Sequence, residues 1–229
     1  MADKKNVEVD KGELMIAQAK DFWGKYQKPI MIVCGAIILL GGGWLGYKNF
    51  IKAPKEKKAF NAMFKAEEYF RLDSFRRALN GDGANPGFLK IISQHSGTKA
   101  ANLAHYYAGI CYQKMDDDAN AIKQLKQFST DSKPGMQNTS MYLADSYGAT
   151  GKFQDAFDNY KKAGYAFEQD EAISAYCLYY AAYTAAKKLN KSKEAIELLK
   201  DLKTKYPRST EVGQADQLLA ELGVYSSEN

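Results

Sequence analysis

Few residues in this sequence have the type and spacing needed for catalysis or metal binding. His95 and His105 are the only histidines, and neither lies at a metal-ligand spacing from a cysteine or from the other. The aspartates at 116–118 lack the spacing of a calcium loop, and segment 81–83 lacks the lysine of a phosphate-binding loop. We therefore expect no enzymatic activity, no metal ion and no cofactor.

The three cysteines form no CxxC motif. Cys34 lies in an apolar run, whereas Cys111 and Cys177 lie within separate helical patterns. The simplest interpretation is that they are small buried residues. A disulfide between Cys111 and Cys177 in an oxidising compartment is the alternative, and the sequence leaves it open because it does not give their separation.

Tyrosine is the residue type that indicates a different chemistry, namely molecular recognition. Eleven of the sixteen tyrosines lie between residues 106 and 183. Tyr176, Tyr179, Tyr180 and Tyr183 follow the i, i+3, i+4, i+7 spacing of one helix face. Tyrosine combines a large apolar area with a polar tip, which suits a protein-binding surface. Packing inside the core is the competing role for each of these residues.

The elements that must position these tyrosines follow a repeat. Gly109 and Tyr112 recur as Ala144 and Tyr147, each 35 residues later. A fixed period of this length is typical of a helix-turn-helix repeat, in which small residues let two helices approach closely. The second helix of each copy shows an amphipathic stripe, and a third such stripe starts at Ala195 and ends before Pro207.

These residues resemble the tetratricopeptide repeat over residues 100–208. The resemblance implies an all-α fold, a tetratricopeptide-repeat superhelix (α-solenoid), that binds proteins or peptides along the concave side lined by the first helices. The candidate groove residues, taken from their spacing on those helices, are Tyr106, Ile110, Met141, Asp145, Tyr176, Tyr179 and Tyr183. Tyr107, Tyr112 and Tyr147 are expected to belong to the core.

Repeat proteins that capture the C-terminal carboxylate of cytosolic chaperones use a clamp of Lys, Asn and Arg in this groove. The matching places here carry Tyr106, Ile110, Asp145, Tyr176 and Tyr180. The clamp is therefore absent, which argues against an import receptor of the mitochondrial type. The net charge of +5 is spread along the chain without a basic face, so we expect no nucleic-acid partner.

A membrane-spanning helix is predicted at residues 29–48. Residues 29–47 are nineteen positions without a charge, which as a helix span roughly 28 Å, close to the thickness of a bilayer core. Trp23 and Tyr26 before this run, and Trp44 and Tyr47 at its end, form the aromatic belts of such a helix. A cleaved signal peptide is the alternative, although its charged region would be unusually long.

Two features of this segment bear on packing and orientation. Gly42 and Gly46 form a GxxxG pair that could pack against another membrane helix. Four lysines occur in the twenty residues before the span and six in the twenty after it, a bias that places the repeats in the cytoplasm. This rule weakens where a long domain follows the span.

The remaining segments flank the span and the repeats. Residues 1–28 are expected to be a polar tail followed by a short interfacial amphipathic helix containing Phe22 and Trp23. Residues 53–99 begin with a charged junction at Pro54 and continue as N-terminal helices or a degenerate repeat. Residues 209–224 are expected to form a capping helix that begins at Ser209.

The complete layout resembles the ancillary subunit of the bacterial Sec translocon (the YfgM-like family), through Phe22 with Trp23, Lys28, and Gly43 with Trp44. This resemblance implies a single-pass protein of the bacterial inner membrane with periplasmic repeats. Its partners would be translocon subunits, emerging chains or periplasmic chaperones. The alternative is a structural scaffold of a membrane complex with a cytoplasmic repeat domain. The sequence predicts no oligomeric state.

Overall fold

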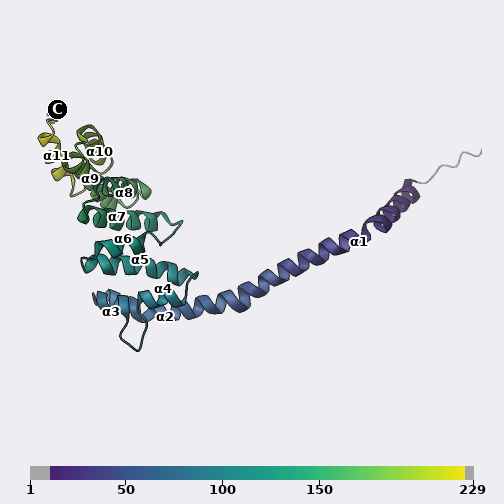
Figure 1. Ribbon diagram of the computed structural model, residues 1–229. Helices are drawn as coiled ribbons and strands as arrows, with labels where there is room; N and C mark the ends of the chain where they lie inside the picture. Colours follow the sequence, from purple (N-terminus) through teal and green to yellow (C-terminus); the bar gives the residue numbers. More distant parts are fainter. Residues whose placement is uncertain (1–10, 225–229) are drawn as a thin grey trace, which may run out of the picture. The chain divides into compact units, whose positions relative to one another are not determined.

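The computed structural model describes residues 11–224 (Figure 1), and these residues divide into two compact units between Pro54 and Lys55. Within residues 11–224 the secondary structure is helical, apart from an isolated antiparallel bridge between Gly81 and Pro86. The predicted all-α fold class is therefore confirmed.

The N-terminal unit consists of helix α1 (Lys11–Gly46) and the π-helix η1 (Tyr47–Lys52). By length and composition, this region is apolar enough to cross a membrane. The expected interfacial helix is not separate, because α1 continues through Pro29 without a break. A Cβ added at Gly42 or Gly46 would meet no atom within 4 Å, so packing of these glycines against a partner helix stays a prediction.

The expected charged junction at Pro54 is helical instead. Helix α2 already begins at Ala53, whose N–H donates to the carbonyl of Lys48 with the i to i−5 spacing of a π-helix. Proline cannot donate a backbone hydrogen bond, and its ring clashes with the carbonyl four residues earlier in a regular α-helix. The wider π turn directly before Pro54 accommodates both effects.

Ten helices make up most of the C-terminal unit (Figure 1) among the described residues. They are α2 (Ala53–Arg71), α3 (Phe75–Asn80), α4 (Phe88–Gln94), α5 (Lys99–Lys114), α6 (Asp118–Leu125), α7 (Lys133–Ala149), α8 (Phe153–Ala166), α9 (Glu171–Lys188), α10 (Ser192–Lys205) and α11 (Val212–Glu221). Helices α5 to α10 form the three helix pairs expected from the repeat, namely α5–α6, α7–α8 and α9–α10.

The small residues of the repeat lie where paired helices approach closely. A Cβ built on Gly109 of α5 would come within 2.5 Å of the Leu125 Cγ on α6. At the equivalent position of α7, Ala144 is fully buried. The side chains of Thr98, Ser132 and Asp170 accept hydrogen bonds from the first turns of α5, α7 and α9, which fixes where these helices begin.

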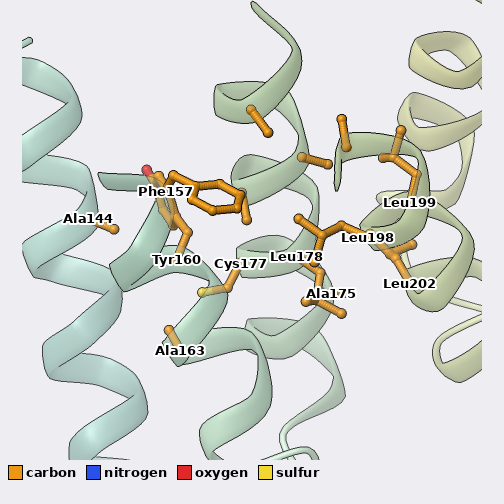
Figure 2. Packing of buried hydrophobic residues seen from close by; sticks show 14 of the residues in the cluster. Ala144, Phe157, Tyr160, Ala163, Ala175, Cys177, Leu178, Leu198, Leu199 and Leu202 are labelled. Atoms are coloured by element: carbon orange, nitrogen blue, oxygen red, sulfur yellow. The ribbon is translucent and has the colours of Figure 1, made fainter. Parts of the chain in front are cut away.

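Two apolar clusters form the core of the repeat unit. The first joins α2, α3, α4 and α5 through buried residues such as Met63, Phe88 and Cys111. The second extends from Ile122 of α6 to Leu219 of α11. Figure 2 shows part of this second cluster, in which side chains of α8, α9 and α10 pack together. Each helix pair thus shares its core with the pairs next to it in the chain, as expected of a repeat array.

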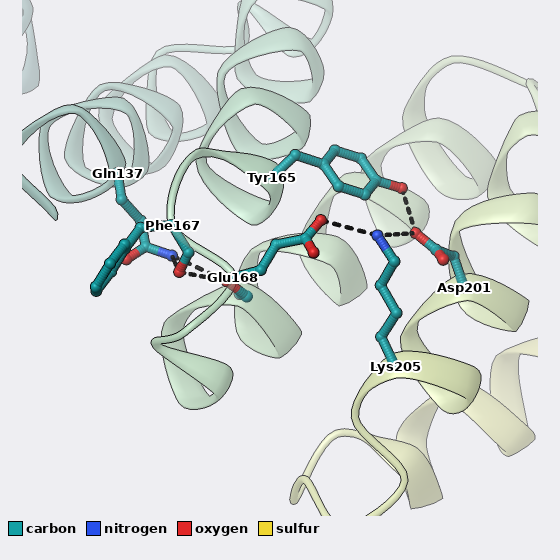
Figure 3. Close-up of polar contacts among 7 residues, drawn as sticks. Gln137, Tyr165, Phe167, Glu168, Asp201 and Lys205 are labelled. Carbon is teal, nitrogen blue, oxygen red and sulfur yellow. Dashed lines mark hydrogen bonds and ion pairs between the residues drawn. The ribbon is translucent and has the colours of Figure 1, made fainter. Parts of the chain in front are cut away.

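The loop between α8 and α9 is held from two sides (Figure 3). The buried Gln137 Nε2 donates to the Phe167 carbonyl at 3.2 Å and to the Ser174 Oγ at 2.9 Å. On the other side, the Lys205 Nζ of α10 donates to the Glu168 carboxylate at 2.8 Å. These contacts fix the start of α9 relative to α7 and α10.

Contacts at the two ends of the unit fix its first helix and show that its last helix begins later than predicted. At one end, the Glu56 carboxylate of α2 accepts from the backbone N–H of Lys99 at 3.0 and 3.2 Å, so α2 contacts the start of α5. At the other end, Ser209 does not cap the last helix. Its N–H donates to the Tyr206 carbonyl in a turn, and α11 begins only at Val212 with Glu211 as its N-cap.

Candidate functional site

Aromatic and acidic side chains from three successive helices meet in one region of the repeat unit. Helix α7 supplies Asp145, α8 supplies Tyr160, and α9 supplies Tyr176 and the tyrosines that follow it on the same face. We name this region the tyrosine surface, and it consists of Asp145, Tyr160, Tyr176, Tyr179, Tyr180 and Tyr183.

Asp145 is the polar centre of the tyrosine surface. The Tyr160 hydroxyl donates a hydrogen bond of 2.5 Å to its Oδ1 atom. Burial raises the pKa of the Asp145 carboxyl, and the hydrogen-bonding groups of Tyr160 and Tyr176 only partly oppose this effect. Burial, together with the negative charge of Asp145, raises the pKa of the Tyr160 hydroxyl. The pair therefore consists of a partly desolvated carboxylate held in place by a neutral hydroxyl.

The tyrosine rings of this surface contact one another. The rings of Tyr176 and Tyr180 lie 4.5 Å apart between centroids, and Tyr160 stacks on Tyr180 at 5.7 Å. Tyr179 continues the series, with its ring 5.3 Å from Tyr180 and 6.3 Å from Tyr183. Such offset and tilted arrangements are the favourable geometries for aromatic pairs.

The exposure of these rings differs across the tyrosine surface. Tyr160 of α8 forms its base and is buried, with 7% of its area exposed. Tyr176, Tyr179 and Tyr180 are partly buried against the second core cluster, whereas Tyr183 is 38% exposed. The surface therefore has a packed base and an accessible aromatic end, the combination that binding hot spots require.

The first helix pair has a different composition at two equivalent positions. Thirty-five residues before Asp145 and Tyr160 lie Ile110 and Leu125. Both are buried, with 4% and 1% of their areas exposed. An apolar pair in α5 and α6 is thus replaced by a hydrogen-bonded acid and tyrosine in α7 and α8.

The structure does not place all the candidate groove residues together. Ile110 is buried, so its expected contribution to an exposed groove is wrong. The reason is that α7 covers this side of α5, where the Gln113 Nε2 donates to the Tyr142 carbonyl and the Ser146 Oγ, both at 3.1 Å. A sequence pattern on one helix does not show which side the next pair will cover.

Tyr106 and Met141 are partly buried, and their side chains pack against neighbouring residues. The ring of Tyr106 lies 5.2 Å from Phe128 and 6.0 Å from Tyr142. Met141 packs against the second core cluster. The candidates that the structure brings together are Asp145, Tyr176, Tyr179 and Tyr183, and their role in binding stays a prediction.

The sequence reasoning missed one member of the tyrosine surface, namely Tyr160. Tyr180 was recognised by its spacing on the same helix face as Tyr176, Tyr179 and Tyr183, although it was not chosen as a groove candidate. Tyr160 lies in the core stripe of α8, at the position where α6 has Leu125. A tyrosine at a leucine position, paired with an acid at an isoleucine position, was the available signal for this contact.

The cysteines do not form the disulfide that the sequence left open. Cys111 and Cys177 are both free and fully buried, and they belong to different core clusters. The expected burial is wrong for Cys34, which is free and exposed on α1. Burial raises the pKa of the Cys111 thiol to about 12 and raises that of Cys177 as well. Both thiols are therefore protonated and act as small apolar residues.

Comparison with known protein families identifies the repeat. Residues 103–131 and 176–209 match the tetratricopeptide repeat, which corresponds to the regions of α5–α6 and α9–α10. The intervening pair α7–α8 is not matched, yet it packs between the two matched pairs. No curated protein and no solved structure matches the chain. The fold is thus a tetratricopeptide-repeat array behind one long apolar N-terminal helix.

Proposed function

We propose that this chain is a membrane-anchored protein-interaction module whose tyrosine surface binds polypeptide segments or partner proteins. Tetratricopeptide repeats are a protein-interaction fold, which supports binding as the general role. The single observation that carries the proposal is the run of contacting tyrosines on α9 that ends in the exposed ring of Tyr183. Aromatic anchors of this kind contribute much of the binding energy at protein interfaces.

The anchor in this proposal is α1, which crosses the bacterial inner membrane once. The supporting observation is its long apolar stretch, whose large side chains, Ile38 and Leu39 among them, are exposed along the helix. Its layout, a long apolar helix followed by repeats, resembles that of ancillary Sec-translocon subunits. By this resemblance the repeats face the periplasm and serve the translocon and its chaperone partners.

A structural scaffold with a cytoplasmic repeat domain is the second candidate function. The higher lysine count after the span than before it favours this orientation. A scaffold would hold a few partners in fixed ratios, whereas a module that handles emerging chains would contact many partners weakly.

Photo-crosslinking in cells tests the binding role. A photoreactive residue replaces Tyr183 in the full chain, and another replaces Glu197, an exposed residue of α10, as the matched control. We expect many crosslinked chains from position 183 and few from position 197. A small set of stoichiometric adducts at position 183 would favour the scaffold. Equal adducts from both positions would contradict a specific role of the tyrosine surface.

Protease treatment of spheroplasts tests the orientation separately. If the repeats are periplasmic, added protease digests them while the inner membrane is intact. If the repeats are protected until the membrane is lysed, the cytoplasmic orientation is correct and the proposed translocon accessory role is wrong.

A further inference from the structure

We propose that the tyrosine surface selects polypeptide segments that carry a lysine or arginine, and that the Asp145 carboxylate binds this cationic side chain. The inference deepens the proposed function and rests on it. It adds the chemical class of the ligand and the residue that recognises it.

The first observation is that Asp145 forms no ion pair with any lysine, arginine or histidine among residues 11–224. Lys114 and Asp118 act on its pKa in opposite directions, so the two do not amount to a neutralising partner. A half-buried carboxylate without a cation is costly to the folded protein, and a cationic ligand would remove that cost.

The second observation is that packing does not require this carboxylate. In the preceding helix pair, the equivalent positions are filled by Ile110 and Leu125, which are buried and apolar. The same fold therefore accepts an apolar pair there. The acid and its tyrosine partner are an addition to the repeat that packing alone leaves unexplained.

The third observation is the set of aromatic rings beside the carboxylate. The Tyr160 hydroxyl occupies the Oδ1 atom of Asp145, and the Tyr176 hydroxyl also affects this carboxyl. The rings of Tyr176 and Tyr180 lie next to each other, with centroids 4.5 Å apart. Aromatic faces attract ammonium and guanidinium groups. A carboxylate beside tyrosine rings is therefore suited to a basic side chain with an aliphatic stem.

The net charge of the chain helps to separate this inference from general electrostatics. At +5, the protein as a whole attracts acidic peptides and repels basic ones. A preference for a basic peptide would therefore have to come from a local acidic group. Tighter binding of the basic peptide than of the acidic one is therefore a result that non-specific attraction to this protein cannot produce.

The test uses the full chain in detergent micelles and three fluorescent decapeptides with acetylated N-termini. The peptides consist of leucine and serine and differ at one central position, which is lysine, glutamine or glutamate. Acetylation removes the terminal ammonium, so the central side chain is the sole source of positive charge. Fluorescence anisotropy gives the affinity of each peptide for the wild type, for Asp145→Asn and for the control Asp131→Asn.

We expect the lysine peptide to bind the wild type about tenfold more tightly than the glutamine peptide, the size of one hydrogen-bonded charge contact. The glutamate peptide should bind most weakly. Asp145→Asn should bind the lysine and glutamine peptides equally. Asp131 lies in the exposed loop after α6, so Asp131→Asn should keep the wild-type preference. The asparagine at position 145 can still accept from Tyr160, and circular dichroism should show that this variant is folded.

Three results would overturn the inference. If Asp145→Asn keeps the preference for lysine, another group recognises the cation. If the wild type binds the three peptides equally, and Tyr179→Ala weakens all of them, the inference is wrong while the proposed function stands. If no peptide binds the wild type, the proposed binding function fails and the inference fails with it.

Discussion

Helix pairs α5–α6 and α7–α8 have the same architecture but differ at two equivalent positions, one on each helix of the pair. The first pair has Ile110 and Leu125, both buried. The second has Asp145 and Tyr160, joined by a hydrogen bond of 2.5 Å. The comparison shows that this architecture accepts apolar residues at these positions. We therefore interpret the polar pair as part of the proposed binding surface.

The largest expected loss of stability comes from placing an acid in the first pair. Ile110→Asp would bury a carboxylate without the tyrosine partner found in the second pair, since the position equivalent to Tyr160 is Leu125. We expect the free energy of unfolding to fall by about 3–5 kcal/mol, as for other unpaired buried charges. Ile110→Val is the control, with an expected loss of about 1 kcal/mol. Urea unfolding followed by circular dichroism measures both, and equal losses would contradict the buried position of Ile110.

The next largest expected loss of stability comes from a substitution where α5 and α6 approach closely. Gly109→Ala would place its Cβ within 2.5 Å of the Leu125 Cγ, although alanine fits the equivalent position 144 of α7. Overpacking of this kind costs about 1–3 kcal/mol. Gly148→Ala is the matched control, because its Cβ would meet the Ala156 Cβ at 4.0 Å, an ordinary contact. Thermal melting should show a lower Tm for the first variant and an unchanged or higher Tm for the second.

The pattern of the repeat explains why so much of this fold could be predicted. Small residues, tyrosines and apolar stripes at a fixed period determine where helices pair, since each pair contacts mainly its neighbours. The sequence thus predicted the helix pairs and the buried state of Tyr147, which is 9% exposed. The long apolar helix followed from composition alone.

Other features depend on contacts that spacing does not encode. The burial of Ile110 depends on how α7 packs against α5, and the hydrogen bond of Asp145 joins two helices. Ser209 was a good capping residue by type, but the turn after Tyr206 delays the last helix to Val212. The π-helix before Pro54 is a local adjustment that periodicity cannot show.

Making the second pair resemble the first gives a smaller effect on stability. Asp145→Ile combined with Tyr160→Leu replaces the polar pair with the apolar residues of α5 and α6. We expect the free energy of unfolding to stay equal or rise by about 1 kcal/mol, because well-packed apolar residues often replace buried polar pairs without loss. Tyr160→Leu alone should be destabilising, since it leaves Asp145 without its donor. A double variant less stable than this single variant would contradict our interpretation of the comparison.

The smallest expected effect is a dependence on pH. Burial raises the pKa of Asp145 above its ordinary value of 3.8, so the folded state binds its proton more tightly than the unfolded state does. The contribution of Asp145 to the free energy of unfolding of the wild type is then greatest below pH 3.8. This contribution is lost as the pH rises through the folded-state pKa. Asp145→Asn should therefore be the more stable protein at pH 7.

Melting curves at several pH values measure this difference. The advantage of Asp145→Asn over the wild type should shrink as the pH falls from 7 towards 3.8. The exposed control Asp131→Asn should differ from the wild type by less than about 0.5 kcal/mol throughout. An advantage of Asp145→Asn that grows in acid would mean that the folded protein favours the charged form of Asp145.

The most direct test of the central claim, that the tyrosines of α9 form a binding surface, is the double variant Tyr179→Ala, Tyr183→Ala. Binding of the lysine decapeptide and the Tm are measured on the same preparation. We predict that affinity falls more than tenfold, since each aromatic anchor contributes about 2 kcal/mol, while the Tm falls by less than about 5 °C. Unchanged affinity with a large fall in Tm would show that these tyrosines serve packing and would contradict the account.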